Sequence, residues 1–140
     1  MNLILTGSLL LAILLSGCED ESQTPIPASE NPVDAARNFI DAKLDRRWQE
    51  ARKFILPNAT NAGLIEKLEA FYENEDREER RGYRGASIIT YDLKKLSDTA
   101  SIYIFADSFK KQKDSVKVVR QNGQWLVDLG FSTLPTTPAK

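Results

Sequence analysis

Apolar residues recur at intervals of three and four through the first half of the chain, which is the spacing of helices with one buried face. The first helix is predicted to begin after Asn31, because Asn31 can cap it and Pro32 suits the first helical position. The charged triplet 45–47 leaves two alternatives open, one long helix or two shorter ones. The apolar stripe comprises Val33, Ala36, Ile40, Leu44, Trp48, Ala51 and Ile55.

A further helix is predicted from Thr60 to Tyr72, and a strongly charged stretch, 73–81, follows it. Its mixed signs and its acid-before-base pairs four residues apart indicate a solvated helix end that runs into a loop at Gly82. A charged surface for a partner is the alternative interpretation of the same residues.

The second half of the chain is predicted to form strands over 86–96, 99–109, 115–121 and 124–129, which are rich in Ile, Val, Tyr and Phe. Asn122-Gly123 predicts a two-residue hairpin turn, since both residue types accept positive φ. That turn places Lys117 opposite Asp128. It also gathers five apolar residues on one face: Val116, Val118, Trp125, Val127 and Leu129.

In the first pair of strands, apolar and polar residues separate less clearly onto the two faces. A turn at Ser97-Asp98 puts Ile89, Tyr91, Leu93, Ile102, Ile104 and Ala106 on one face, which we expect to face the helices. The other face then holds Thr90, Asp92, Tyr103, Phe105 and Asp107, and is too aromatic for simple exposure to solvent. We expect it to line a pocket, to pack on the charged stretch or to form a contact in a homodimer.

Helices followed by a meander of antiparallel strands predict an α+β domain, with the N-terminal helices packed on one face of a curved sheet of about four strands. In that arrangement a pocket between helix and sheet is predicted to be lined by Phe39, Ile40, Tyr91 and Ile104.

The N-terminus carries an apolar run from Leu3 to Leu15 that ends in Leu15-Ser16-Gly17-Cys18. About thirteen residues are too few to span a bilayer, which needs about twenty. The run is typical of a secretory signal peptide, and its end resembles the lipobox of bacterial lipoproteins. The resemblance implies cleavage before Cys18 and attachment of diacylglycerol to its thiol. The predicted organisation is a signal peptide (1–17), a lipidated tether (18–31), a domain (32–131) and a C-terminal tail (132–140).

Composition narrows the classes of function. The formal net charge is −1, from 19 Lys and Arg against 20 Asp and Glu, so there is no electrostatic case for binding nucleic acid. The chain has no His and a single Cys, which removes the commonest general base and the usual metal ligands. We therefore expect no metal site and no cofactor.

Three segments carry a resemblance to a known superfamily: NPVDAARNFIDA (31–42), WQEA (48–51) and VKVVRQNGQWLVD (116–128). They resemble the nuclear transport factor 2-like superfamily, and more narrowly the lumazine-binding-like lipoproteins of unknown function in bacteria. The resemblance implies a cone of the cystatin or nuclear transport factor 2-like kind, a curved sheet wrapped on a long helix with a cavity between them. Some members of that superfamily are enzymes and many are binding or assembly domains.

An isomerase-type site would need a carboxylate base and hydroxyl donors in an apolar pocket, for which Asp92, Asp107, Tyr91 and Tyr103 are the right residue types. In the expected register Asp92 lies opposite Tyr103, which is an ordinary pair in a sheet. We therefore expect no catalytic residue and a domain that binds a small ligand or an envelope protein without chemistry. A small isomerase or hydrolase, and a structural subunit of an envelope complex, are the alternatives.

The predicted cellular location follows from the lipid on Cys18, which would hold the protein on a membrane of the bacterial cell envelope. The residues after it, Cys18-Glu19-Asp20-Glu21-Ser22, resemble the acidic tract of surface lipoproteins in Bacteroidota. This favours the outer membrane and exposure at the cell surface. Acidic residues that merely keep the tether soluble are the alternative explanation.

Overall fold

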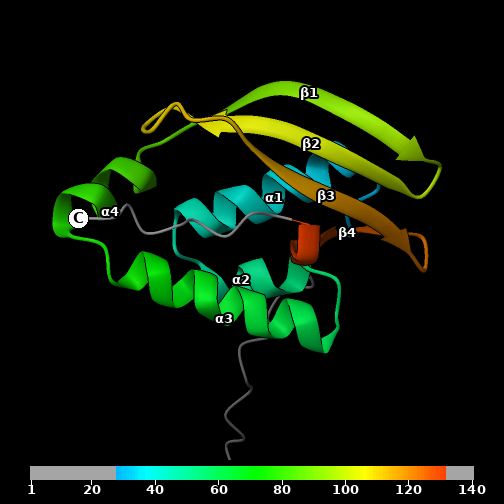
Figure 1. Cartoon of the computed structure of the whole chain (residues 1–140), viewed down its shortest axis with the longest axis horizontal. Helices are drawn as coiled ribbons and strands as arrows, with labels where there is room; N and C mark the ends of the chain where they lie inside the picture. Colours follow the sequence, from blue (N-terminus) through cyan, green and yellow to red (C-terminus); the bar gives the residue numbers. More distant parts are fainter. Residues whose placement is uncertain (1–27, 132–140) are drawn as a thin grey trace, which may run out of the picture.

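The structure is a computed structural model that describes residues 28–131 (Figure 1). The predicted signal peptide, Cys18, most of the tether and the tail 132–140 lie outside the described residues. In chain order the elements are α1 (Pro32–Leu44), α2 (Trp48–Ala51), a 3-10 turn η1 (Arg52–Phe54), α3 (Ala59–Glu73), α4 (Arg77–Arg84), β1 (Ile88–Ser97), β2 (Ala100–Asp107), β3 (Asp114–Gln121), β4 (Gln124–Asp128) and a 3-10 turn η2 (Leu129–Phe131).

The predicted α+β fold class is confirmed. The four strands form one sheet in the order β1-β2-β3-β4, with every neighbouring pair antiparallel. Figure 1 shows the helices on one side of this sheet, with α1 directly beneath the strands and α3 below α1 and α2. The layers therefore leave the other face of the sheet without a helix within the described residues, and we call it the outer face.

The first helix begins as predicted. The Asn31 side chain accepts a hydrogen bond from the Asp34 amide at 2.9 Å, and Pro32 occupies the first turn. The helix ends at Leu44 because Arg46 adopts a positive φ of 60° and the Arg47 amide turns back to the Ala42 carbonyl at 2.8 Å. The two alternatives at 45–47 are thus resolved in favour of separate helices.

The charged stretch after α3 forms its own helix, so the predicted loop at Gly82 is wrong. Asp76 caps α4 by accepting the Glu79 amide at 2.9 Å, and the helix continues to Arg84. Gly82 is required for packing: a Cβ there would lie 2.4 Å from the ring of Phe109, which comes from the loop between β2 and β3. Gly82, which the sequence predicts to end the helix, instead lies within α4 and allows the Phe109 ring to approach its backbone closely.

The terminal hairpin is confirmed in turn, register and faces. Asn122 and Gly123 both have positive φ, 52° and 78°. Lys117 pairs with Asp128, and their charged atoms lie 3.9 Å apart. The five residues assigned to the apolar face are all buried: Val116, Val118, Trp125, Val127 and Leu129.

The first hairpin has its faces reversed relative to the prediction. Its turn is Asp98-Thr99, where Ser97 accepts the Thr99 amide at 3.2 Å, and β1 carries two register shifts, between Thr90 and Asp92 and between Lys95 and Ser97. Asp92 therefore opposes Ile104 and not Tyr103. The helix-facing residues of β2 are the buried aromatics Tyr103 and Phe105.

The prediction failed there because aliphatic residues were assigned to the core. Tyr103 is fully buried and Phe105 is 3 % exposed, and their stacked rings fill the space above α1. The Tyr103 hydroxyl is satisfied by the Thr90 hydroxyl, which removes the cost of burying it. The isoleucines of β2 alternate with the aromatics and so lie on the outer face.

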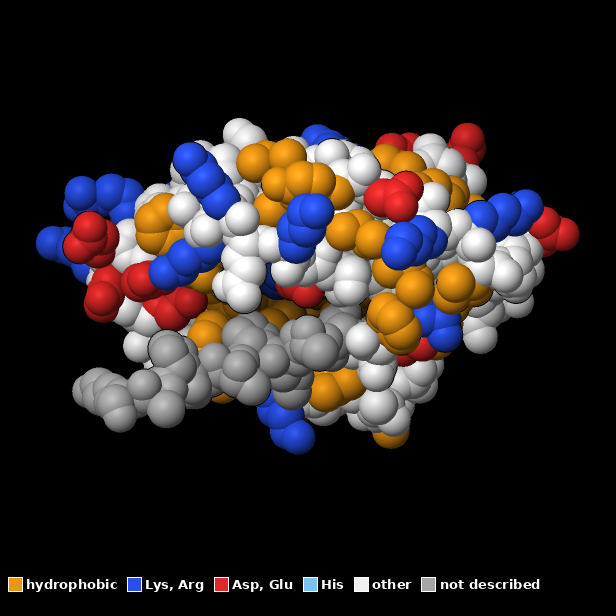
Figure 2. All heavy atoms as spheres, turned by 45° about the horizontal axis from the view of Figure 1, so that its top comes forward, with side chains coloured by type: hydrophobic (Ala, Val, Ile, Leu, Met, Phe, Trp, Pro, Cys, Tyr) orange, Lys and Arg blue, Asp and Glu red, His pale blue; other side chains and the backbone are white. Residues whose placement is uncertain are grey.

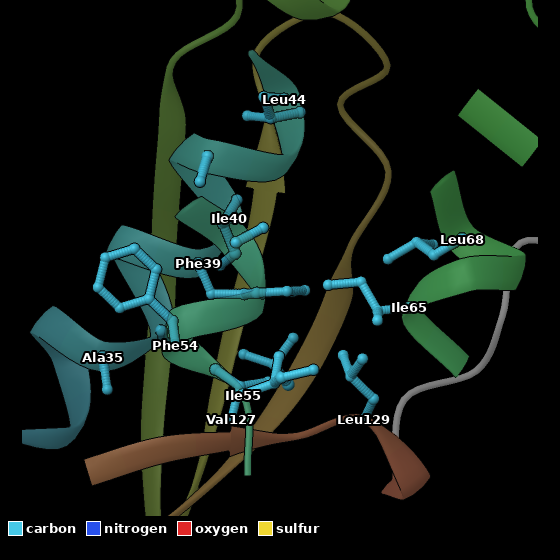
Figure 3. Packing of buried hydrophobic residues seen from close by; sticks show 14 of the residues in the cluster. Ala35, Phe39, Ile40, Leu44, Phe54, Ile55, Ile65, Leu68, Val127 and Leu129 are labelled. Carbon is cyan, nitrogen blue, oxygen red and sulfur yellow. The ribbon is translucent and has the colours of Figure 1, made fainter. Parts of the chain in front are cut away.

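The core lies between the sheet, α1 and α3. Figure 3 shows Phe39 of α1 and Ile65 of α3 facing one another, with Val127 and Leu129 beside them. The predicted stripe is buried at six of its seven positions, Ala36, Ile40, Leu44, Trp48, Ala51 and Ile55. The β4 edge is covered, because the Trp125 amide donates to the Ser29 carbonyl at 3.1 Å and Ile55 bridges to Val127. Within residues 28–131, β1 pairs on one side only and is the open edge.

Candidate functional site

A lysine is buried between the end of α1 and the sheet. Lys43 is only 7 % exposed, and its ammonium group lies over two aromatic rings, 5.7 Å from the centroid of Tyr72 and 5.6 Å from that of Phe105. These three residues come from α1, α3 and β2, so the fold brings them together from distant parts of the sequence. Cation–π contact of this kind compensates part of the lost hydration of the ammonium.

The charge of Lys43 has no direct counter-ion. Within residues 28–131 its Nζ has no hydrogen-bond acceptor and no carboxylate at ion-pair distance. Burial lowers the pKa of Lys43 from its usual 10.5, and the carboxylates of Asp114 and Asp107 offset this only partly from longer range. An unpaired ammonium in such surroundings is costly for a fold, and it attracts any group that can supply the missing negative charge.

Two tyrosines extend the site away from Lys43. The rings of Tyr72 and Tyr83 meet edge to face at 5.2 Å, and Tyr83 meets Phe109 at the same separation. Burial raises the pKa of both tyrosines, with neighbouring carboxylates adding to the effect. Both hydroxyls therefore keep their protons and act as donors, and no acceptor for either lies among the described residues.

The two carboxylates that act on Lys43, Asp107 and Asp114, accept hydrogen bonds from backbone amides. The Asp107 side chain accepts the amides of Phe109 and Lys110, at 3.0 and 2.7 Å, and so holds the loop after β2. The Asp114 side chain accepts the Ser115 amide at 2.7 Å. These two carboxylates contribute negative potential near Lys43, while one oxygen of each, Oδ1, is engaged in a local turn.

An ion pair supports Tyr72 from behind. Arg46 donates to Glu75 at 2.9 Å and to the Tyr72 carbonyl, and its guanidinium carbon lies 6.0 Å from the Tyr72 ring centroid. Burial raises the pKa of Glu75, while Arg46 opposes that rise. Trp48 closes the same side, with its ring 5.8 Å from that of Tyr72 and its indole N–H donating to Glu73 at 3.3 Å.

Figure 2 shows a hollow between the sheet and the lower helices, with hydrophobic side chains along it. The rim on the α4 side carries Lys110, which pairs with Glu79 at 2.6 Å and lies 4.9 Å over the ring of Phe109. We call the group formed by Lys43, Tyr72, Tyr83 and Phe105 the Lys43 site.

The structure does not bring the four predicted pocket residues together. Phe39 and Ile40 lie in the core, at 1 % and 0 % exposure. The placement of Tyr91 and Ile104 on the helix-facing side is wrong: Tyr91 falls at a register shift of β1 and is 49 % exposed, with Lys113 over its ring, and Ile104 lies on the outer face. Ile104 is on the outer face because Tyr103 and Phe105, at the alternate positions of β2, take the helix-facing side.

The residues considered for catalysis are also separated. Asp92 accepts the Leu93 amide at 2.8 Å on the exposed edge strand, whereas Tyr103 is buried beneath the sheet. Sequence analysis missed the Lys43 site, although one signal was available. Lys43 follows Phe39 by four residues and Ile40 by three, so helical spacing places it on the apolar face of α1.

The described residues offer neither a metal site nor a membrane-spanning helix. Residues 28–131 contain no group of three potential metal ligands of the His, Cys, Asp and Glu types. No helix in this part of the chain has the length and hydrophobicity needed to cross a membrane. The chain matches no family model, no characterised protein and no solved structure in comparisons of sequence and fold.

Proposed function

We propose that this chain is a lipid-anchored protein of the bacterial cell envelope whose domain binds a ligand without chemistry, and that the Lys43 site is where the ligand binds. The observation that carries the proposal is the position of the Lys43 ammonium, on a side chain 7 % exposed, over two aromatic rings and without an ion pair to the described residues. Among the described residues the buried side-chain atom without a hydrogen-bond partner is Arg46 Nε, so the Lys43 Nζ keeps some contact with solvent. A bound anion would replace that solvent with a direct counter-ion.

The state of the carboxylates favours binding over catalysis. A proton-abstracting enzyme needs a carboxylate free to approach its substrate within a pocket. Asp107 and Asp114 instead hold backbone amides, and Asp92 does so on the exposed edge of the sheet. Screening with ester, phosphoester and enolisable ketone substrates tests this part. Turnover that disappears in Asp107→Asn or Asp92→Asn would replace the binding proposal with the isomerase or hydrolase alternative.

The finer fold assignment belongs to the same proposal. We infer a cone of the nuclear transport factor 2-like kind, on the segments that resemble that superfamily. The arrangement of α1 beneath a four-stranded antiparallel meander supports it, as does the position of the Lys43 site between helix and sheet.

Lipid anchoring rests on Leu15-Ser16-Gly17-Cys18 and is tested by fractionation. Cys18→Ser is expected to leave the precursor uncleaved or to release the protein from the membrane fraction. Ser16→Ala is the matched control, because a small residue is kept beside an intact cysteine. Separation of inner from outer membranes, and protease treatment of intact cells, then test the outer membrane and the exposed surface. A Cys18→Ser variant that migrates and fractionates like the parent would refute the anchor.

A structural role in an envelope assembly is the second candidate. The Tyr103 and Phe105 face, suggested for that role by the sequence, is buried in the core and is unavailable. The outer face takes its place, since Ile89 and Tyr91 are 38 % and 49 % exposed there. Figure 2 shows hydrophobic side chains on this face interspersed with Lys and Arg. Light scattering of the purified chain, alone and after cross-linking in cells, distinguishes a monomer, a homodimer and a larger complex.

A further inference from the structure

We propose that the Lys43 site takes a ligand with one carboxylate group joined to an apolar body, the carboxylate pairing with the Lys43 ammonium. This inference rests on the proposed function and specifies the class of ligand. It follows from three properties of the site: an unpaired buried cation, a limit on the negative charge that the site accepts, and aromatic walls.

The cation is the first property. Lys43 is 7 % exposed, and its Nζ lies over two aromatic rings, at 5.6 and 5.7 Å from the ring centroids. A ligand oxyanion would form the direct ion pair that the described residues do not provide. In water-poor surroundings such a charge-assisted hydrogen bond is about twice as strong as a neutral one. The Tyr72 ring lies against the same ammonium, and we expect its hydroxyl, kept protonated by burial, to donate to the second oxygen of that group.

The second property limits the charge of the ligand. Asp107 and Asp114 both act on Lys43 and on Tyr72 through their negative charge, whereas the charge of Glu75 is balanced by Arg46 at 2.9 Å. The Lys43 charge can compensate one negative charge brought by a ligand. A phosphate monoester, with nearly two charges at neutral pH, would meet net repulsion from these carboxylates. A carboxylate, with a single charge and two oxygens, fits this balance.

The aromatic walls are the third property. Phe105 and Tyr72 flank the ammonium, and Tyr83 and Phe109 continue the wall toward the rim. Phe109 is 38 % exposed, so part of this apolar surface faces solvent when the site holds no ligand. A ligand with an apolar body would cover that surface, which adds affinity in proportion to the area removed from water.

The test compares four small aromatic probes on the full-length lipidated chain in detergent micelles. Phenylacetate carries the carboxylate, 2-phenylethanol is neutral, phenyl phosphate is a dianion and phenethylamine is a cation. Binding is followed by calorimetry and by tryptophan fluorescence, because Trp48 lies 5.8 Å from Tyr72 in ring separation. Phenylacetate is expected to bind at least about tenfold more tightly than 2-phenylethanol, the gain of one charge-assisted hydrogen bond. Phenyl phosphate and phenethylamine are expected to bind more weakly than phenylacetate.

Three variants assign that preference. Lys43→Met keeps the apolar length of the side chain and removes the charge, so it is expected to abolish the preference for phenylacetate over 2-phenylethanol. Tyr72→Phe keeps the ring and is expected to weaken phenylacetate binding by about three- to tenfold, the effect of one hydroxyl donor. Lys67→Met, on the exposed side of α3, is the matched control and is expected to bind like the parent.

The outcomes separate this inference from the function on which it rests. Equal affinity for phenylacetate and 2-phenylethanol would show that the site binds ligands but would overturn the carboxylate. Tighter binding of phenyl phosphate, or Lys43→Met binding phenylacetate like the parent, would overturn it as well. Absence of binding by all four probes would overturn both the ligand class and the Lys43 site, while the lipid anchor stands or falls with the fractionation of Cys18→Ser.

Discussion

Asn61 offers a sharp test of how this domain is held together. It is fully buried in the first turn of α3, and its side chain joins two segments that are far apart in sequence. Its Nδ2 donates to the Leu56 carbonyl at 3.0 Å, and its Oδ1 accepts the Leu129 amide at 2.9 Å. The substitution Asn61→Leu keeps the branching and the number of heavy atoms of the side chain and removes both hydrogen bonds.

The cost can be worked out from these two bonds. The variant leaves the Leu129 amide without a partner in a buried position, at about 1–3 kcal/mol. The Leu56 carbonyl loses one of its two hydrogen bonds and still accepts the Asn58 amide at 3.0 Å, so its loss is about 0.5–1.5 kcal/mol. The expected loss is therefore about 2–4 kcal/mol, a large share of the 5–15 kcal/mol that typically stabilises a domain. The helix cap is untouched, because Asn58 accepts the backbone amide of residue 61 at 2.8 Å and not its side chain.

Urea denaturation followed by the fluorescence of Trp48 and Trp125 measures this loss, since both indoles are buried. Asn74→Leu is the matched control. Asn74 makes a similar bond, from Nδ2 to the Ala70 carbonyl at 2.8 Å, but it is exposed, so water replaces the bond. Its expected cost is under about 1 kcal/mol. Equal losses in the two variants, or a loss below 1 kcal/mol for Asn61→Leu, would refute the argument from buried unpaired groups.

Three further predictions concern other parts of the fold. Trp125→Ala is expected to lower the free energy of unfolding by about 3–5 kcal/mol in urea melts, because the side chain lies in the core; a loss under about 1 kcal/mol would contradict that position. Lys43→Met is expected to be more stable than the parent at pH 7. Between the lowered pKa of Lys43 in the folded state and 10.5, the unfolded parent binds more protons than the folded parent, so the stability of the parent rises with pH. Melts at rising pH should therefore show the difference in unfolding free energy between variant and parent shrinking toward pH 10.5; a growing difference would contradict the argument. Gly123→Ala is expected to cost about 1–2 kcal/mol in thermal and urea melts because φ is 78° there, whereas Gly63→Ala, inside α3 with open space around it, should gain about 0.5–1 kcal/mol; the same sign for both would contradict the backbone explanation.

The parts of the fold that sequence could predict are those with a local physical signal. Asn31-Pro32 determines where α1 begins, and Asn122-Gly123 determines the turn from which the last hairpin takes its register. The first hairpin has no such signal, because Ser97, Asp98 and Thr99 all suit a turn. Register shifts within β1 depend on tertiary packing, which a pattern of alternating residues does not contain.

The Lys43 site could not be predicted as a whole, although each member is visible in the sequence. A lysine at the C-terminal end of a helix is ordinarily exposed and favourable to the helix dipole. Its burial depends on α3 and α4 folding over it, and Tyr72 and Tyr83 stand on either side of the charged stretch 73–81, which the sequence pattern predicts to be a solvated helix end. Helical spacing from Phe39 gives the face of α1 on which Lys43 lies, but not the depth of burial.

The open edge of β1 has a consequence for the lipid-anchored state that we propose above. Copies confined to a membrane share two dimensions and are crowded far beyond their concentration in solution, which is the condition under which unpaired strand edges polymerise. In β1 the regular pairing extends only over 92–95 between the two irregularities, and Lys94 and Lys95 stand within it. A neighbouring copy therefore meets an edge too short and too positively charged to extend an intermolecular ladder, so the domain can be displayed densely without aggregating through its sheet.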